Sequence, residues 1–275
     1  MHLSDIQFIF NRAASLTFSR KKLLFVSSIL LMCGLLVVFF RGLSLEAGSW
    51  IVMSLTFLPI FLCAGILLST GIVLVRIYHD EIKKKQVSYL GVLSKSWELV
   101  IGASYFSIPI ILCYLLLWMM LGIFFLLREI PGVGDFFGVV LSFGPFLINL
   151  GSLALCLLNI SMLFFVAPII ALRGMNRITV SKVLVERIRS DLFSNVILSL
   201  IAIFPLLFFI GIGSLAAFLT GSICTDCANS VHTILLWFFI MIPFVVLLAP
   251  AVIFFFNFAA ESHVLLQKKI AAKGT

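Results

Sequence analysis

Residues 23–40 read LLFVSSILLMCGLLVVFF, a stretch without a charged side chain between Lys22 and Arg41. About 20 predominantly apolar residues cross the hydrocarbon core of a bilayer as a helix, so we expect a membrane span here. The stretch ends at Phe39 and Phe40 without the small residues that a cleavage site needs. An uncleaved first span is therefore favoured over a signal peptide.

Five further stretches without charge follow along the chain. The fourth is too long for one straight span, and we expect Gly144 and Pro145 to divide it. Hydrophobic residues make up 63% of the chain and charged residues 11%, whereas roughly a quarter of the residues of a soluble domain are charged. The sequence thus predicts an all-α, polytopic membrane helix bundle, a single domain over residues 1–275, with spans at residues 23–40, 51–75, 99–127, 146–172, 192–220 and 233–260.

The basic residues are unevenly distributed over the segments that flank these spans. Of 19 Lys and Arg residues, only Arg41 and Arg128 lie in the connections after the first, third and fifth spans. Retention of Lys and Arg on the cytoplasmic side sets the orientation of a membrane protein. We therefore expect a multi-pass protein of the inner (plasma) membrane with its N- and C-termini in the cytoplasm.

A membrane surface explains the formal net charge of +8. Each basic residue near anionic headgroups contributes on the order of 1 kcal/mol, and the basic residues lie beside the spans. The expected partner is thus a bilayer with anionic headgroups, and nucleic acid is not expected. The residues expected to contact lipid headgroups are Lys83, Lys84, Lys85, Arg173, Arg177 and Lys182.

The chain divides into three units of one amphipathic helix followed by two spans, over residues 1–80, 81–175 and 176–265. In the third unit Leu184, Ile188 and Leu192 recur every four residues and form an apolar stripe. The alternative to a threefold repeat is that any amphipathic helix before a span shows this pattern. Such helices would lie in the membrane interface or fold under the bundle, and the sequence leaves both placements open.

Two stretches carry a family resemblance. Residues 85–97, which begin KQVSYL, and residues 167–181, which begin APII, resemble the loosely defined six-span bacterial membrane proteins. These include the membrane domain attached to some glycerophosphodiester phosphodiesterases, and most of them are of unknown function. The resemblance covers essentially the whole chain and implies a six-span topology. It implies no hydrolytic activity, because the sequence contains no soluble phosphodiesterase domain.

Neutral polar residues are the candidates for chemistry inside the spans, which contain no acid or base. Asn149, Ser152 and Asn159 share one face of the fourth span and would line a polar groove. Their alternative role is to hydrogen-bond to neighbouring helices, for about 1 kcal/mol or less each. This structural role is favoured, since ion-coupled transport normally leaves an acid or base in a span.

Two kinds of cluster lie outside the spans. Cys224 and Cys227 stand in the connection expected outside, where an oxidising compartment would favour a possible disulfide. Free thiols, or a redox or metal site, are the alternatives. Residues 79–81 (His-Asp-Glu) and 261–263 (Glu-Ser-His) lie at the expected inner surface. They would bind a cation only if the two segments converged, and solvated charge is the favoured interpretation.

The functional hypothesis is a scaffold or accessory membrane component without a recognisable catalytic site. Neither enzymatic activity nor a metal or cofactor is expected. The alternative is a transporter or permease for an apolar or amphiphilic solute or lipid, and a cavity reaching the midplane would favour it. Gly213, Ala217 and Gly221 form a ladder of small residues in the fifth span. Such ladders form packing seams, here within the bundle, in a homo-oligomer or with a membrane-protein partner.

Overall fold

The computed structural model describes residues 3–45, 47–85, 89–131, 134, 138–139, 143–174, 177–190, 192–221 and 230–273. Over these residues the chain forms α1 (Leu3–Ser15), α2 (Arg20–Leu43), α3 (Ser49–Ile82), α4 (Tyr89–Arg128), α6 (Phe143–Arg173), α7 (Arg177–Ser190), α8 (Leu192–Leu219) and α9 (Ser230–Lys273). This part of the chain contains no strand, which confirms the all-α class.

The helices α2, α3, α4, α6, α8 and α9 are long and apolar enough to cross a membrane. They coincide with the six predicted spans and confirm the helix bundle. Most extend beyond the uncharged stretches and include charged residues at their ends. The division of the fourth stretch at Gly144 and Pro145 stays a prediction, since residues 140–142 lie outside the described part of the chain. Helix α6 begins at Phe143, so Pro145 lies in the first turn, where its missing N–H costs no hydrogen bond.

The amphipathic segments differ from one another in the structure. Helices α1 and α7 are separate, as expected for the first and third units. The second is the beginning of α4, which runs without a break from Tyr89 to Arg128. The threefold repeat stays a prediction.

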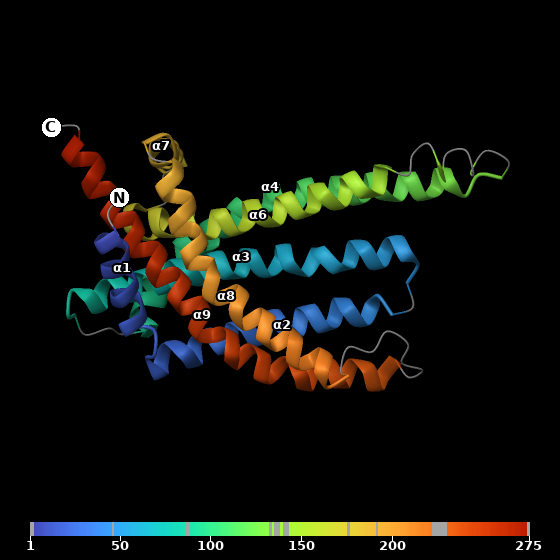
Figure 1. Cartoon of the computed structure of the whole chain (residues 1–275), viewed down its shortest axis with the longest axis horizontal. Helices are drawn as coiled ribbons and strands as arrows, with labels where there is room; N and C mark the ends of the chain where they lie inside the picture. Colours follow the sequence, from blue (N-terminus) through green and yellow to red (C-terminus); the bar gives the residue numbers. More distant parts are fainter. Residues whose placement is uncertain are drawn as a thin grey trace.

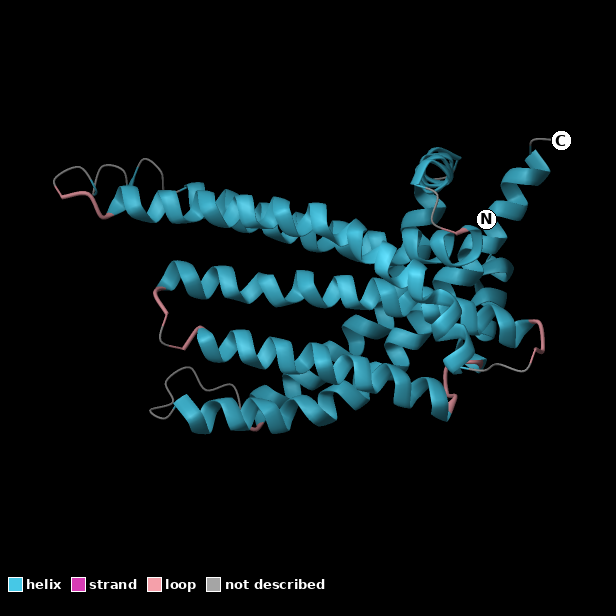
Figure 2. Cartoon of the chain, turned by 180° about the vertical axis from the view of Figure 1, so that it is seen from behind, coloured by secondary structure: helices cyan, strands magenta, loops and turns pink. Residues whose placement is uncertain are grey.

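Both chain termini, α1 and α7 lie at one end of the bundle (Figure 1), which we call the basic end. The basic end includes Arg12, Lys22, Arg76, Arg173 and Arg187. Towards the opposite end the helices diverge, with α4 and α6 running as a pair (Figures 1 and 2). Helix α3 packs against α4 and α6, α2 packs against α9 and α3, and α8 packs chiefly against α9.

Burial is concentrated at the basic end. Every residue of α9 from 251 to 263 is buried, and α9 as a whole contacts α1, α2, α3, α6, α7 and α8. In contrast, only 11% of the most apolar window of α8 is buried. Exposed Leu, Ile and Phe side chains on that scale would be unfavourable in water, whereas hydrocarbon solvates them. The fold thus places its packed core at one end and lipid-facing surface along most of its length.

Candidate functional site

An ion pair joins α2 to α3 at the basic end. Lys22 is fully buried, and its Nζ donates hydrogen bonds to the Glu81 carboxylate and to the Leu16 carbonyl oxygen, the latter 3.1 Å away. A buried ammonium group is costly unless it is paired. Glu81 belongs to the cluster at residues 79–81 for which solvated charge was the favoured interpretation, and for Glu81 that interpretation is wrong.

A second carboxylate joins three helices. Glu261 of α9 accepts a hydrogen bond of 2.9 Å from the Tyr78 hydroxyl of α3 and pairs with Arg12 of α1, with 3.4 Å between Arg12 Nε and Glu261 Oε1. One carboxylate of each predicted cluster, Glu81 and Glu261, is therefore used in contacts between helices. Among the described residues, no three His, Cys, Asp or Glu side chains are arranged to hold a metal ion.

Arg76 connects α3 to α4 and α6. Its Nε donates to the Ala171 carbonyl oxygen at 3.1 Å, and its Nη1 donates to Ser96 Oγ at 3.0 Å. Hydrogen bonds from a charged donor are about twice as strong as neutral ones. The basic side chain at the end of the α3 span is therefore part of the packed structure.

Arg187 is the most deeply buried arginine among the described residues, with 2% of its surface exposed. Its Nε donates to Asn195 Oδ1 of α8 at 3.0 Å, and its Nη1 lies 3.3 Å from His263 Nδ1 of α9. The guanidinium also lies 4.8 Å from the centre of the Phe165 ring of α6. Burial lowers the pKa of the Arg187 guanidinium to about 9, and the group stays charged near neutral pH because that value is still above 7.

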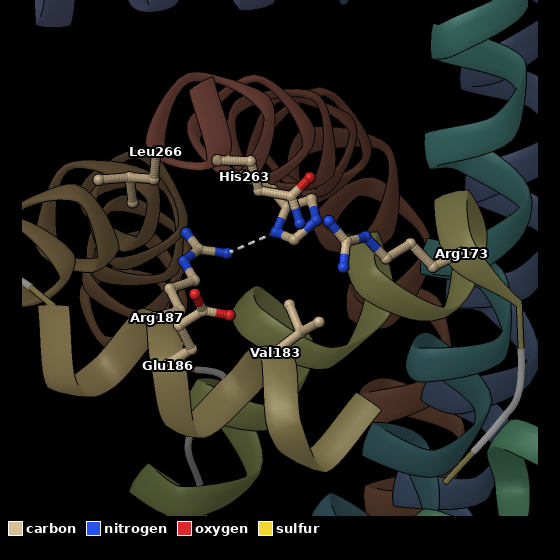
Figure 3. A pocket seen from close by; sticks show the side chains of 7 residues that line it. Arg173, Val183, Glu186, Arg187, His263 and Leu266 are labelled. Atoms are coloured by element: carbon tan, nitrogen blue, oxygen red, sulfur yellow. Dashed lines mark hydrogen bonds between the residues drawn. The ribbon is translucent and has the colours of Figure 1, made fainter. Parts of the chain in front are cut away.

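A cavity of about 230 Å³ adjoins this arginine, between the end of α6, α7 and α9 (Figure 3). A single water needs roughly 10–15 Å³ on the same measure, so several waters or a small polar ligand would fit. Arg173 and Glu186 are exposed, so the cavity reaches the surface beside them. Its lining residues are Arg173, Val183, Glu186, Arg187, His263, Leu266 and Gln267.

The predicted polar groove is only partly assembled. Asn149 and Ser152 line a cavity of about 10 Å³ together with side chains of α3 and α4, and Asn159 is buried but is not among its lining residues. The Ser152 hydroxyl donates back to the Ile148 carbonyl oxygen of its own helix at 3.0 Å. The cavity has room for about one water.

The structure places most of the predicted headgroup residues at the surface of the basic end. Lys83, Lys84, Lys85, Arg173 and Lys182 are exposed, and their contact with lipid stays a prediction. Arg173 also lines the large cavity. Nothing is described of the Arg177 side chain, and Cys224 and Cys227 lie outside the described residues.

Sequence reasoning named Arg173 and His263 for other reasons but missed Arg187, the buried charge of the large cavity. Leu184 of the predicted apolar stripe is partly buried and packs against the core, and the fully buried residues of α7 include Val180, Val183 and Arg187. Arg187 follows Val183 by four residues and Val180 by seven, a spacing that places all three on one side of a helix. That spacing could have placed Arg187 on the buried face of α7. Its charge made the face difficult to recognise as a buried one.

Comparison with protein-family models, curated proteins and solved structures finds no match for this chain. The resemblance to the membrane domain of glycerophosphodiester phosphodiesterases stays a prediction. The helices themselves identify the general class of the protein. Six helices of this length and apolarity make it a multi-pass membrane protein.

Proposed function

We propose that this protein is a non-enzymatic component of the bacterial inner membrane and acts as a scaffold or accessory subunit. One observation carries the proposal: charged side chains of α1, α2, α3 and α7 each bind a group on another helix at the basic end. These groups are used to hold helices together, which is a structural role.

The same contacts weigh against transport. Alternating access requires one part of a bundle to rock against another around the binding site. Such a movement at the basic end would separate Lys22 from Glu81, or Arg187 from Asn195 and His263. Breaking a buried ion pair by removing one partner costs about 3–5 kcal/mol. The contacts therefore oppose relative movement of the helices where a transporter would need it.

The inside of the spans supports the same proposal. A groove reaching the midplane along Asn149, Ser152 and Asn159 would favour movement of a solute. The first two residues instead line a space of about 10 Å³ that Tyr114 and Trp118 also border. Packing of this density suits a static bundle better than a passage for a lipid or an amphiphilic solute.

We place the basic end in the cytoplasm, with α1 and α7 accessible to partners there. Both termini lie at this end (Figure 1), as an even number of crossings requires. The support for the choice of compartment is the distribution of Lys and Arg. Reporter tags fused to the two ends test it: both should report the cytoplasm, and tags in opposite compartments would overturn the topology.

Reconstitution tests the scaffold against the transporter. Full-length protein in sealed vesicles should move neither labelled lipid nor a broad panel of apolar and amphiphilic solutes faster than protein-free vesicles do. Protein-dependent movement of any of them would replace the proposal by transport.

Purification tests the scaffold directly. From a mild detergent and at native expression levels, the protein should be recovered with the same membrane-protein partner, or a second copy of itself, in repeated preparations. Recovery of the bare monomer each time would count against a scaffold.

A further inference from the structure

We propose that the cavity between α6, α7 and α9 binds one phosphate-type oxyanion, supplied by a phospholipid headgroup or as free phosphate (Figure 3). The recognising groups are Arg173, Arg187, His263 and Gln267. This inference does not depend on whether the protein is a scaffold or a transporter.

The hydrogen bond between Arg187 and His263 determines which imidazole nitrogen carries the proton. An arginine has only donors, so Arg187 Nη1 donates and His263 Nδ1 accepts, at 3.3 Å. The ring is therefore neutral and its proton is on Nε2. His263 is 1% exposed, and Nε2 has no hydrogen-bond partner among the described residues. A buried N–H donor is thus left beside the cavity.

Gln267 supplies a second donor of the same kind. It follows His263 by four residues on α9, which places both side chains on one face of the helix, and both line the cavity. Gln267 Nε2 is likewise buried without a hydrogen-bond partner among the described residues. Buried polar groups in native proteins nearly always have partners, so two such donors in one cavity indicate an acceptor that occupies it.

The charges around the cavity select an anion. Arg173 and Arg187 bring two positive charges, and Glu186 brings one negative charge at the exposed side. Figure 3 shows the His263 ring between the two guanidinium groups. A cation would meet two arginines and two N–H donors. A phosphate group offers several acceptor oxygens with negative charge, and it matches the forked donors of arginine.

Size and position limit the ligand to a headgroup-sized anion. About 230 Å³ is below the roughly 300–1,000 Å³ of sites for drug-sized ligands, but it holds a phosphate group with a few waters. Arg173 is the last residue of the α6 span and lies exposed at the opening. A lipid lying against α6 would therefore present its phosphate to the cavity while its acyl chains stay in the bilayer.

Delipidated full-length protein in a phosphate-free maltoside detergent provides the test. One arm titrates inorganic phosphate and the other titrates phosphatidic acid, with chloride at equal ionic strength as the control. Binding is followed by the thermal unfolding midpoint and by native mass spectrometry. Saturable binding of one equivalent in the phosphate arm identifies a free anion as a ligand, and binding in the lipid arm alone identifies the headgroup.

Two variants, each with a matched control, assign the binding to this cavity. Arg173→Gln should weaken the apparent affinity roughly tenfold or more, since it removes a charged donor. Arg189→Gln removes an exposed charge of α7 that does not line the cavity and should change it by less than about twofold. Gln267→Glu replaces the amide donor by a carboxylate of the same shape. Its negative charge repels the anion, so this variant should abolish binding. Gln7→Glu on the exposed face of α1 should not.

Absence of saturable binding in both arms overturns the proposal and leaves a water-filled cavity. Equal weakening by Arg173→Gln and Arg189→Gln also overturns it, because binding would then depend on diffuse surface charge. Unchanged affinity in Gln267→Glu would place the ligand elsewhere. All variants are first compared with the wild type by circular dichroism and size-exclusion chromatography.

Discussion

Replacing Glu81 by Met should destabilise the bundle more than replacing Lys22 by Met, although both changes remove the same ion pair. The Lys22 side chain is fully buried, whereas that of Glu81 is 20% exposed. Glu81→Met leaves a buried ammonium group, and we expect a loss of about 3–5 kcal/mol, the cost of an unpaired buried charge. Lys22→Met removes the buried charge and leaves a carboxylate that water reaches, so we expect about 1–2 kcal/mol.

Reversible unfolding in mixed detergent micelles, followed by circular dichroism, measures both losses. The double variant should lose at least about 1 kcal/mol less than the sum of the single losses, because the charge that Glu81→Met strands is then absent. Lys83→Met, at an exposed position next to the end of α3, should stay within about 0.5 kcal/mol of the wild type. Losses that are additive, or larger for Lys22→Met than for Glu81→Met, would refute this account of the pair.

Three further changes test the packing and the surface. Gly71→Ala should cost about 1–3 kcal/mol, because its Cβ would lie 2.1 Å from the buried Phe256 ring. Gly211→Ala meets nothing within 4 Å and should gain about 0.5–1 kcal/mol, so equal shifts in unfolding would contradict this packing. Tyr114→Phe removes a hydrogen bond to a backbone carbonyl of α3 and should cost about 1 kcal/mol; an unchanged unfolding curve would show that the hydroxyl is not bound. Replacing the lysines at 83–85 by Gln should weaken retention of anionic lipid on purification, or invert the membrane topology in part of the population. An unchanged lipid profile and topology would show that these lysines matter little.

The six spans could be predicted because a bilayer imposes the same requirements on every segment that crosses it. Each must be long, uncharged and helical, and residues 23–40 show this without reference to the rest of the chain. The continuity of α4 from Tyr89 was harder to foresee. A Ser at position 88 followed by an amphipathic stretch suits the start of a separate helix, but residues 92–101, across the join with the span, contain no Gly or Pro to end that helix.

The contacts between helices could not be predicted, because they join residues far apart in sequence. Lys22 and Glu81 are each ordinary charges at the end of a span, and only the packing of α2 on α3 makes them a pair. His263 was recognised as part of a polar cluster, yet its partner Arg187 lies on another helix. Sequence patterns indicate whether a residue lies in apolar or polar surroundings. They do not report which of several similar partners supplies a hydrogen bond.

Arg187 connects the stability of the basic end with the proposed anion site. Its Nε and Nη1 hold α8 and α9 through Asn195 and His263, and the same side chain lines the cavity. An anion that binds there only in the folded protein stabilises the fold by mass action, and it would do so at the junction of α7, α8 and α9. Helix α8 has few other contacts, since it packs chiefly on α9. Occupation of the cavity should therefore secure the fifth span to the bundle, and loss of the anion should loosen that span before any other.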